Sequence, residues 1–259
     1  MALATMWRLA RVLLHVLQGM AICATVFPWL GQQKRNGQIR RWSRQLLRLC
    51  NVTVVQDGGV NSVAPAPVLS QAMLVSNHVS WLDIFVIHSL YPSHFVAKAE
   101  IRSWPLAGWL AQKAGTVFIA RGNRRDLRLI FEGLVATLRR GERVAFFPEG
   151  TTASQGELLP FHANLFEAAI DAGVPVQPLA LRYVDAGGAL HHAVDFIGEM
   201  TFAESIVAIL SGPAVTARVA IMPAIATVGA HRRELAEVAH GAVAAALGIA
   251  ATPHDQAGV

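Results

Sequence analysis

Residues 71–85 read QAMLVSNHVSWLDIF, an apolar run typical of a buried strand, then polar residues, then a second apolar run. The pattern Ser80-x-x-Asp83 before an apolar run is a capping box, which predicts a helix that starts near Trp81 with Ser80 as its N-cap. The stretch therefore predicts a strand, a short loop and a helix, which is the repeating unit of an α/β fold.

The same stretch places His78 in the loop and Asp83 five residues later. On one continuous helix, residues five apart lie about 140° apart around the axis, so their side chains would not meet. Because the chain changes course at the loop, a carboxylate in the first helical turn can lean back toward the histidine. The alternative is that Asp83 only caps the helix and His78 is an ordinary loop residue, and this stretch alone leaves both open.

Strand and helix patterns alternate along most of the chain. The expected strands are VTVV, AMLVS, HFVA, TVFIA, RVAFFP, VPVQPLALRY and TARVAIM, and the expected helices are DIFVIHSLY, LAGWLAQKA, DLRLIFEGLVATLRRG, LFEAAIDAG and HRRELAEVAHGAVAAALG. This alternation predicts an α/β fold, a largely parallel mixed sheet flanked by helices, with an N-terminal membrane-associated two-helix segment. The expected division is residues 1–50 for the membrane-associated helices, 51–250 for the α/β domain and 251–259 for a disordered tail.

The basic charge of the chain is concentrated at its N-terminus. The first 56 residues contain eight Lys or Arg and no Asp or Glu, although the whole chain has a net charge of only +5. Hydrophobic residues make up 53% of the chain and charged residues only 15%, against about a quarter in an average soluble domain. A basic segment fits nucleic acid or anionic lipid, and the aliphatic residues between the arginines favour lipid, so no nucleic-acid partner is expected.

The N-terminal segment divides into an apolar part and a basic part. Residues 12–30 carry no formal charge over 19 positions, near the roughly 20 needed to span a bilayer. The stretch KRNGQIRRWSRQLLRLC then mixes arginines with apolar residues at helical spacing, as in a helix lying in a membrane interface. We expect two helices over residues 3–50, turning at about Pro28–Asn36, on the cytoplasmic face of the cell membrane, monotopic or single-span. A pair of packed core helices is the alternative.

Several familiar chemistries lack their motifs in this chain. The patterns GxSxG, GxxxxGK[ST], GxGxxG and HExxH are absent, which argues against a nucleophile-elbow hydrolase, a P-loop enzyme, a dinucleotide dehydrogenase and a zincin. Cys23 and Cys50 have no ligand spacing, so neither a disulfide nor a metal site is expected. His191 and His192 lie in a Gly-rich stretch and are expected at the surface.

Polar residues follow several of the expected strands at the point where each strand ends. They are Asn77-His78, Arg121 and Glu149-Gly150-Thr151. In open α/β sheets, the carboxyl ends of the strands form the edge at which ligands bind, so these residues predict one common site. Gly150 permits a tight turn that exposes backbone N–H groups.

Four blocks in this order resemble the glycerolipid acyltransferase family, typified by 1-acylglycerol-3-phosphate acyltransferases. NHVSWLD resembles its NHxSxxD block, GTVFIAR its GxxFIxR block, FPEGT its FPEGT block and VPVQPLAL its VPxxPxAL block. The resemblance runs from about residue 74 to 182. It implies acyl transfer from acyl-CoA or acyl carrier protein, as co-substrate and without a further cofactor, to the free hydroxyl of a lysolipid. Anionic membrane lipids and the lysolipid acceptor are the implied partners.

The resemblance also implies roles for single residues. His78 would act as the general base, and Asp83 would hold its imidazole. The backbone around Gly150-Thr151 would stabilise the oxyanion. Arg121 would bind the phosphate of the acceptor, and Glu149 would help to position that acceptor.

Two further residues belong to this implied site. Asn77 would position the catalytic loop. Lys98 is a weaker candidate for an anionic contact, and a solvated lysine at a strand end is its alternative.

The chain departs from the family pattern after FPEGT. Thr152-Ala153 stands where many members have Arg-Ser, and His-Ala-Asn at residues 162–164 stands where many have basic and glycine residues. These departures resemble the branch that acylates lyso-ornithine lipids, whose amino-acid head group carries no phosphate, and Arg121 would then bind a carboxylate. Lysophosphatidate is the first acceptor by this reading and lyso-ornithine lipid the alternative. A catalytically silent lipid-binding member is a further possibility.

Overall fold

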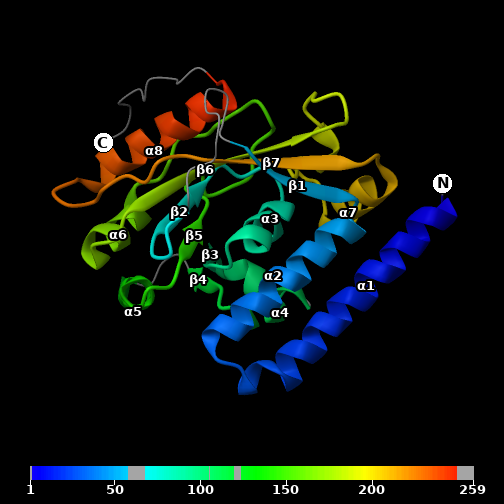
Figure 1. Cartoon of the computed structure of the whole chain (residues 1–259), viewed down its shortest axis with the longest axis horizontal. Helices are drawn as coiled ribbons and strands as arrows, with labels where there is room; N and C mark the ends of the chain where they lie inside the picture. Colours follow the sequence, from blue (N-terminus) through cyan, green and yellow to red (C-terminus); the bar gives the residue numbers. More distant parts are fainter. Residues whose placement is uncertain (1, 58–67, 105, 120–123, 250–259) are drawn as a thin grey trace.

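The computed structural model describes residues 2–57, 68–104, 106–119 and 124–249, which form a central sheet with helices on both faces (Figure 1). The described strands make one seven-stranded sheet in the order β1-β7-β6-β2-β5-β3-β4. They are β1 (Val52–Asp57), β2 (Met73–Ser76), β3 (His94–Lys98), β4 (Val117–Ile119), β5 (Val144–Phe146), β6 (Val176–Val184) and β7 (Val215–Ile221). All neighbouring strands run parallel except β6 and β7, so the predicted largely parallel mixed sheet is confirmed.

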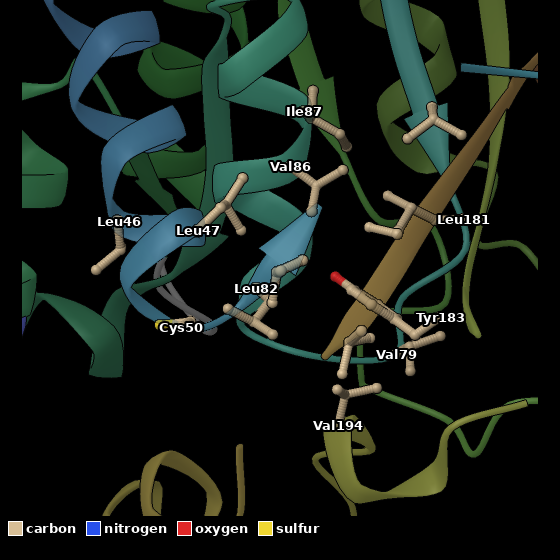
Figure 2. Packing of buried hydrophobic residues seen from close by; sticks show 14 of the residues in the cluster. Leu46, Leu47, Cys50, Val79, Leu82, Val86, Ile87, Leu181, Tyr183 and Val194 are labelled. Atoms are coloured by element: carbon tan, nitrogen blue, oxygen red, sulfur yellow. The ribbon is translucent and has the colours of Figure 1, made fainter. Parts of the chain in front are cut away.

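The helices divide into two layers, each of which buries an apolar face against the sheet. They are α1 (Ala2–Thr25), α2 (Gln32–Leu49), α3 (Leu82–Leu90), α4 (Ala107–Lys113), α5 (Arg124–Arg139), α6 (Glu167–Ala172), α7 (Phe202–Ser211) and α8 (Arg232–Leu247). One core cluster takes side chains from α2, α3 and α7, and the other takes side chains from α5, α6 and α8. Figure 2 shows the first cluster, where side chains of α2 and α3 meet those of β6.

The helix that the sequence reading missed is α7. Its N-terminus carries a full capping box, in which Thr201 accepts the backbone N–H of Glu204 and the Glu204 carboxylate accepts the backbone N–H of Thr201. The pattern Thr-x-x-Glu is visible in the sequence before an apolar run, so the signal for this helix was present.

The strand–loop–helix unit of residues 71–85 forms as predicted, but its capping box does not. The helix α3 begins at Leu82, one residue later than predicted, and Trp81 takes the N-cap position without a side-chain bond. The Asp83 carboxylate accepts the backbone N–H groups of Val79 and Ser80. The Ser80 hydroxyl is buried without a hydrogen-bond partner. Only the carboxylate half of the predicted box is therefore present.

The N-terminal segment forms the expected two helices, with an earlier turn. The chain turns through a short 3-10 helix at Phe27–Trp29, and α2 starts at Gln32, four residues before the predicted end of the turn. The Gln32 side chain donates to the Asn36 side chain over 3.0 Å, a contact one helical turn apart. This contact supports helix through the stretch that was read as turn.

The two N-terminal helices pack on each other and on the body of the protein. The His15 ring stacks on Trp42 with centroids 4.7 Å apart, and each of these residues donates a side-chain N–H to the backbone carbonyl of the other. A Cβ at Gly19 would come within 2.6 Å of the Trp42 indole, so the close approach needs glycine there. On its inner side, α2 buries Leu46 and Leu47 against α3.

The outer side of α1 is nevertheless apolar. Its exposed large apolar side chains are Leu3, Met6, Trp7, Leu13, Leu14 and Leu17. Within the residues that the structure describes, no helix combines the length and the apolar character that crossing a membrane requires. The predicted tail at 251–259 lies outside the described residues.

Candidate active site

Two polar loops meet at the carboxyl edge of the sheet. The strands β2 and β5 pair in parallel, with Val75 opposite Phe146. The segments that follow them, Asn77-His78 and Glu149-Gly150-Thr151, therefore leave the sheet side by side, as predicted. Backbone bonding ties them together, because the N–H of Ala153 donates to the carbonyl of His78 over 2.8 Å.

At the first of these loops, His78 and Asp83 form a dyad. The distance from His78 Nδ1 to Asp83 Oδ2 is 2.8 Å, and Asp83 is fully buried. The same Oδ2 accepts the backbone N–H groups of Val79 at 2.7 Å and Ser80 at 2.9 Å. The carboxylate in the first turn of α3 thus does lean back to the histidine, and the loop supplies the change of direction that the contact needs.

The geometry leaves His78 Nε2 available. Because a carboxylate accepts at Nδ1, Nδ1 carries the proton of the neutral ring and Nε2 carries the lone pair. In the described part of the chain Nε2 has no hydrogen-bond partner, and the side chain is 18% exposed. The Phe147 ring stacks on the imidazole with centroids 3.8 Å apart and an angle of 6°, which fixes the plane of the ring.

Glu149 supports the histidine loop from inside the protein. Its Oε1 accepts the backbone N–H of His78 at 2.7 Å, and its Oε2 accepts the backbone N–H of Leu159 at 2.9 Å. Burial raises the pKa of Glu149 to about 7. The hydrogen bonds from the two backbone N–H groups lower this pKa, but burial outweighs them. Both carboxylate oxygens of Glu149 accept backbone hydrogen bonds. These contacts fit a residue that positions His78 better than one that binds the acceptor, which is the role that the resemblance implies.

Asn77 anchors the same loop to β6. Its side-chain amide donates to the Leu181 carbonyl at 2.9 Å, and its oxygen accepts the Leu181 N–H at 2.8 Å. This paired contact is what a residue that positions the loop would make, in line with the role expected for Asn77.

The Gly150 turn exposes a backbone donor, although not the one at Gly150 itself. Gly150 has φ +68°, a left-handed conformation that favours glycine, and its N–H donates to the Phe147 carbonyl at 3.1 Å. Thr151 is exposed, and its backbone N–H has no partner among the described residues. The Thr151 N–H is therefore a donor in this turn that could face an oxyanion.

His162, from a later segment of the chain, packs against the same turn. Its backbone N–H donates to the Pro148 carbonyl at 2.9 Å, and a Cβ built on Gly150 would lie 3.4 Å from His162 Cδ2. The His-Ala-Asn departure is thus next to the site in space, although His162 follows Gly150 by 12 residues in sequence.

The predicted anion contacts are less fully described. Lys98 is exposed at the carboxyl end of β3, two strands from β2 on the same edge. Arg121 lies outside the described residues. Within the described residues no group of three or more His, Cys, Asp or Glu could hold a metal ion. Both cysteines are buried and free, and burial raises the pKa of Cys50 to about 12.

An apolar groove borders the dyad loop. It has a volume of about 350 Å³ and is lined by Trp104, Ala107, Phe196, Met200, Thr201 and Phe202. The Phe196 N–H donates to the Val79 carbonyl at 3.0 Å, and Trp81 packs on Phe202 with ring centroids 5.0 Å apart. Both contacts join the groove to residues within three positions of His78.

The sequence reading missed two residues that contact the dyad directly, Phe147 on the imidazole and Tyr183 on the carboxylate. The Tyr183 hydroxyl donates to Asp83 Oδ1 at 2.7 Å. The signal available was a tyrosine in a largely buried strand, since a buried tyrosine hydroxyl usually has a partner. Nothing in the sequence identified that partner as Asp83.

Comparison with known proteins agrees with the blocks that carry the resemblance. A family model described as Acyltransferase matches residues 59–182. The chain is 39% identical over 252 residues to a lyso-ornithine lipid O-acyltransferase of Pseudomonas aeruginosa, covering 95% of this chain and 94% of that protein. The chain belongs to the glycerolipid acyltransferase family.

Two further relatives of this acyltransferase family member bear on its acceptor and its fold. A 1-acyl-sn-glycerol-3-phosphate acyltransferase of Neisseria meningitidis is 51% identical over 138 residues, and the match spans about half of each protein, 53% of this chain and 54% of the relative. The crystal structure of the 1-acyl-sn-glycerophosphate acyltransferase PlsC from Thermotoga maritima matches with a TM-score of 0.63 and 20% identity, over 93% of this chain and 96% of that one. This structural likeness shows a shared fold.

Proposed function

We propose that this protein transfers a fatty acyl group from an acyl-thioester, acyl-CoA or acyl carrier protein, to the free hydroxyl of a lysolipid. The preferred acceptor is 1-acylglycerol-3-phosphate, which would give phosphatidate. The observation that carries the proposal is the His78–Asp83 contact of 2.8 Å, with His78 Nε2 left open at the carboxyl edge of the sheet.

In the proposed reaction, Nε2 of His78 takes the proton of the acceptor hydroxyl while the hydroxyl oxygen attacks the thioester carbonyl. The tetrahedral adduct then breaks its C–S bond and expels the thiolate of the donor, which takes the proton back from His78. Asp83 holds the imidazole through Nδ1 and stabilises its cation. Because the acceptor oxygen attacks the thioester directly, no covalent acyl-enzyme forms. General-base help of this kind is typically worth about 10²–10⁴ in rate. The Thr151 N–H is a donor for the developing oxyanion, and the apolar groove beside the loop suits an aliphatic chain of a substrate.

The second candidate acceptor is lyso-ornithine lipid. It is favoured by the Pseudomonas relative, which matches along almost the whole chain, and by the position of His162 against the Gly150 turn. Thr152 also differs from the arginine of many members, and its hydroxyl donates to the Phe196 carbonyl. An acceptor without a phosphate would need one fewer cationic contact at this position.

Acyl transfer by membranes that contain this protein tests the proposal. Lysophosphatidate and lyso-ornithine lipid are supplied in parallel, each with labelled acyl-CoA and with acyl-loaded carrier protein. We expect His78→Ala to lower the rate by at least about 10²-fold. His94→Ala is the matched control, because His94 also contacts a carboxylate but lies at the opposite edge of the sheet.

Product from lysophosphatidate that depends on His78 supports phosphatidate synthesis, and product only from lyso-ornithine lipid supports the second acceptor. Transfer that persists in His78→Ala would exclude the proposed base. Absence of transfer to either acceptor, from either donor, would favour a silent lipid-binding member.

We also propose that the α1–α2 pair holds the protein on an anionic membrane surface. Apolar side chains including Trp7 and Leu14 cover the outer side of α1. The helix that packs on α1, α2, has a basic hollow of about 380 Å³, lined by Gly37, Arg40, Arg41, Arg44, Gln45 and Arg48. Lysolipid acceptors reside in bilayers, so a membrane-bound enzyme would meet its substrate there.

Co-sedimentation with vesicles tests this placement. Each basic residue near an anionic surface contributes about 1 kcal/mol, so Arg40→Gln with Arg41→Gln should weaken binding to phosphatidylglycerol vesicles by roughly 30-fold. Binding to phosphatidylcholine vesicles should change little. The same loss on both vesicle types would contradict a charge-driven contact.

A further inference from the structure

Asp83 accepts hydrogen bonds at both of its carboxylate oxygens, and one of these oxygens has a single side chain as its donor. Oδ2 accepts from His78 Nδ1 and from the backbone N–H groups of Val79 and Ser80. Oδ1 accepts from the Tyr183 hydroxyl at 2.7 Å, its one hydrogen bond among the residues described. Asp83 and Tyr183 are each fully buried, so water does not replace that donor.

Tyr183 belongs to a different part of the chain from the dyad. It lies on β6, 100 residues from Asp83, and directly after the stretch that the family model matches. In Figure 2 its ring reaches from β6 toward α3, with the hydroxyl oxygen pointing at the helix. The register of β6 is fixed nearby by the paired contacts of Asn77 with Leu181.

We propose that Tyr183 is a positioning residue of the catalytic dyad, which sets the orientation and the charge distribution of Asp83 and through it the basicity of His78. The proposal rests on the proposed acyl transfer, in which His78 is the base. A hydroxyl donor at Oδ1 stops the carboxylate from rotating, so Oδ2 stays in line with Nδ1. It also draws negative charge toward Oδ1, away from the imidazole.

The ionisation of Tyr183 is consistent with a donor that does not change state. Burial, followed by the charge of Asp83 and the hydrogen bond to it, raises the pKa of Tyr183 well above that of a free tyrosine. The other ionisable side chains that face Asp83 are His78, in the same loop, and Glu149, after β5. Any change that Tyr183 makes to the pH dependence therefore has to be separated from that of Glu149.

The test is Tyr183→Phe, which removes only the hydroxyl. We expect kcat to fall about tenfold with the KM for the acceptor unchanged within twofold, because a charge-assisted bond to the orienting carboxylate is lost and the substrate site is not. With more negative charge facing the imidazole, the protonated ring is favoured, so the acid limb of the pH profile of kcat/KM should move to higher pH. Tyr91→Phe is the matched control, since the hydroxyl of the other tyrosine bonds the Gln56 side chain.

A double-mutant cycle separates positioning from a purely structural role. If Tyr183 acts through Asp83, Tyr183→Phe should have little further effect on kcat in an Asp83→Asn background. Losses of kcat that multiply in the double variant would overturn the proposal, and so would an unshifted acid limb in the single variant.

A measurement without substrate keeps the two proposals distinguishable. The low-field Nδ1 proton resonance of His78 in the labelled, detergent-solubilised protein should move further downfield in Tyr183→Phe and stay in place in Tyr91→Phe. A shift without any acyl transfer by the wild type would reject the proposed function and leave the coupling of Tyr183 to the dyad intact. An unchanged resonance would reject the coupling itself.

Discussion

Two histidine–carboxylate pairs lie on opposite edges of the same sheet, and their surroundings differ. His78, after β2, contacts Asp83 through Nδ1 at 2.8 Å and leaves Nε2 open. His94, the first residue of β3, contacts Glu142 through Nε2 at 2.6 Å and the Gly115 carbonyl through Nδ1 at 3.0 Å. Both ring nitrogens of His94 thus face acceptors, whereas His78 keeps one nitrogen for a substrate.

A short histidine–carboxylate contact by itself does not make a histidine a base. His94 joins the starts of β3, β4 and β5, because its backbone N–H also donates to the Arg143 carbonyl at 2.8 Å. Both ring nitrogens of His94 are occupied by protein acceptors, so neither is open to a substrate. The open Nε2 at the carboxyl edge of the sheet is what makes His78 the candidate base.

The largest effect should come from the carboxylate of the first pair. Asp83→Asn should lower kcat by about 10³–10⁴, because an amide no longer fixes the proton on Nδ1 and places an NH₂ group against backbone N–H groups. Glu142→Gln makes the same chemical change in the second pair and should leave kcat within about threefold. Steady-state rates of the two variants, with circular dichroism as the check on folding, decide the matter. Comparable losses of kcat would remove the distinction between the pairs.

The second effect is on how the free energy of unfolding depends on pH, and it should have opposite signs for Glu149 and Glu142. Burial raises the pKa of Glu149 to about 7, so its contribution to stability is present below about pH 4.5 and is lost as the pH rises through 7. The loss amounts to about 3 kcal/mol of the free energy of unfolding. Burial also raises the pKa of Glu142, but hydrogen bonds from Arg140 and His94 outweigh it and lower the pKa, so that contribution is lost as the pH falls.

Unfolding measured between pH 4 and pH 8 for the wild type, Glu149→Gln and Glu142→Gln checks these signs. As the pH rises from 4 to 8, the free energy of unfolding of the wild type should fall relative to that of Glu149→Gln, because only the wild type has the raised pKa. A slope that is unchanged in Glu149→Gln would show that another group carries the pH dependence.

The smallest effect is expected at His94 itself. His94→Gln loses one of two side-chain hydrogen bonds, so the free energy of unfolding should fall by about 1–2 kcal/mol while kcat stays within about threefold. Thermal unfolding and rates on the same preparation provide both numbers. A loss of kcat approaching that of Asp83→Asn would mean that His94 acts in the reaction and would overturn its role as a structural contact.

Much of this architecture could be predicted from the sequence, because strands and helices alternate with their own periods of apolar residues. The runs that became β2, β5 and β6 were predicted as strands, and the polar residues after β2 and β5 were predicted to converge. The serine half of the capping box at Ser80 was wrong for a local reason: the backbone N–H of Asp83 donates to the Ser80 backbone carbonyl, so the serine hydroxyl does not accept it. The roles of Arg121 and Lys98 stay predictions.

The sequence by itself determined the fold class, the family and, through the family resemblance, the histidine–carboxylate pair, since each rests on short motifs whose own residues are neighbours along the chain. Only the tertiary structure decided what surrounds the pair. Glu149 and Tyr183 lie 71 and 100 residues from their partners His78 and Asp83, and strand pairing together with the packing of α3 on the sheet brings them within hydrogen-bond distance. The geometry of a hydrogen bond between distant residues depends on strand register and on helix placement, which local patterns do not encode.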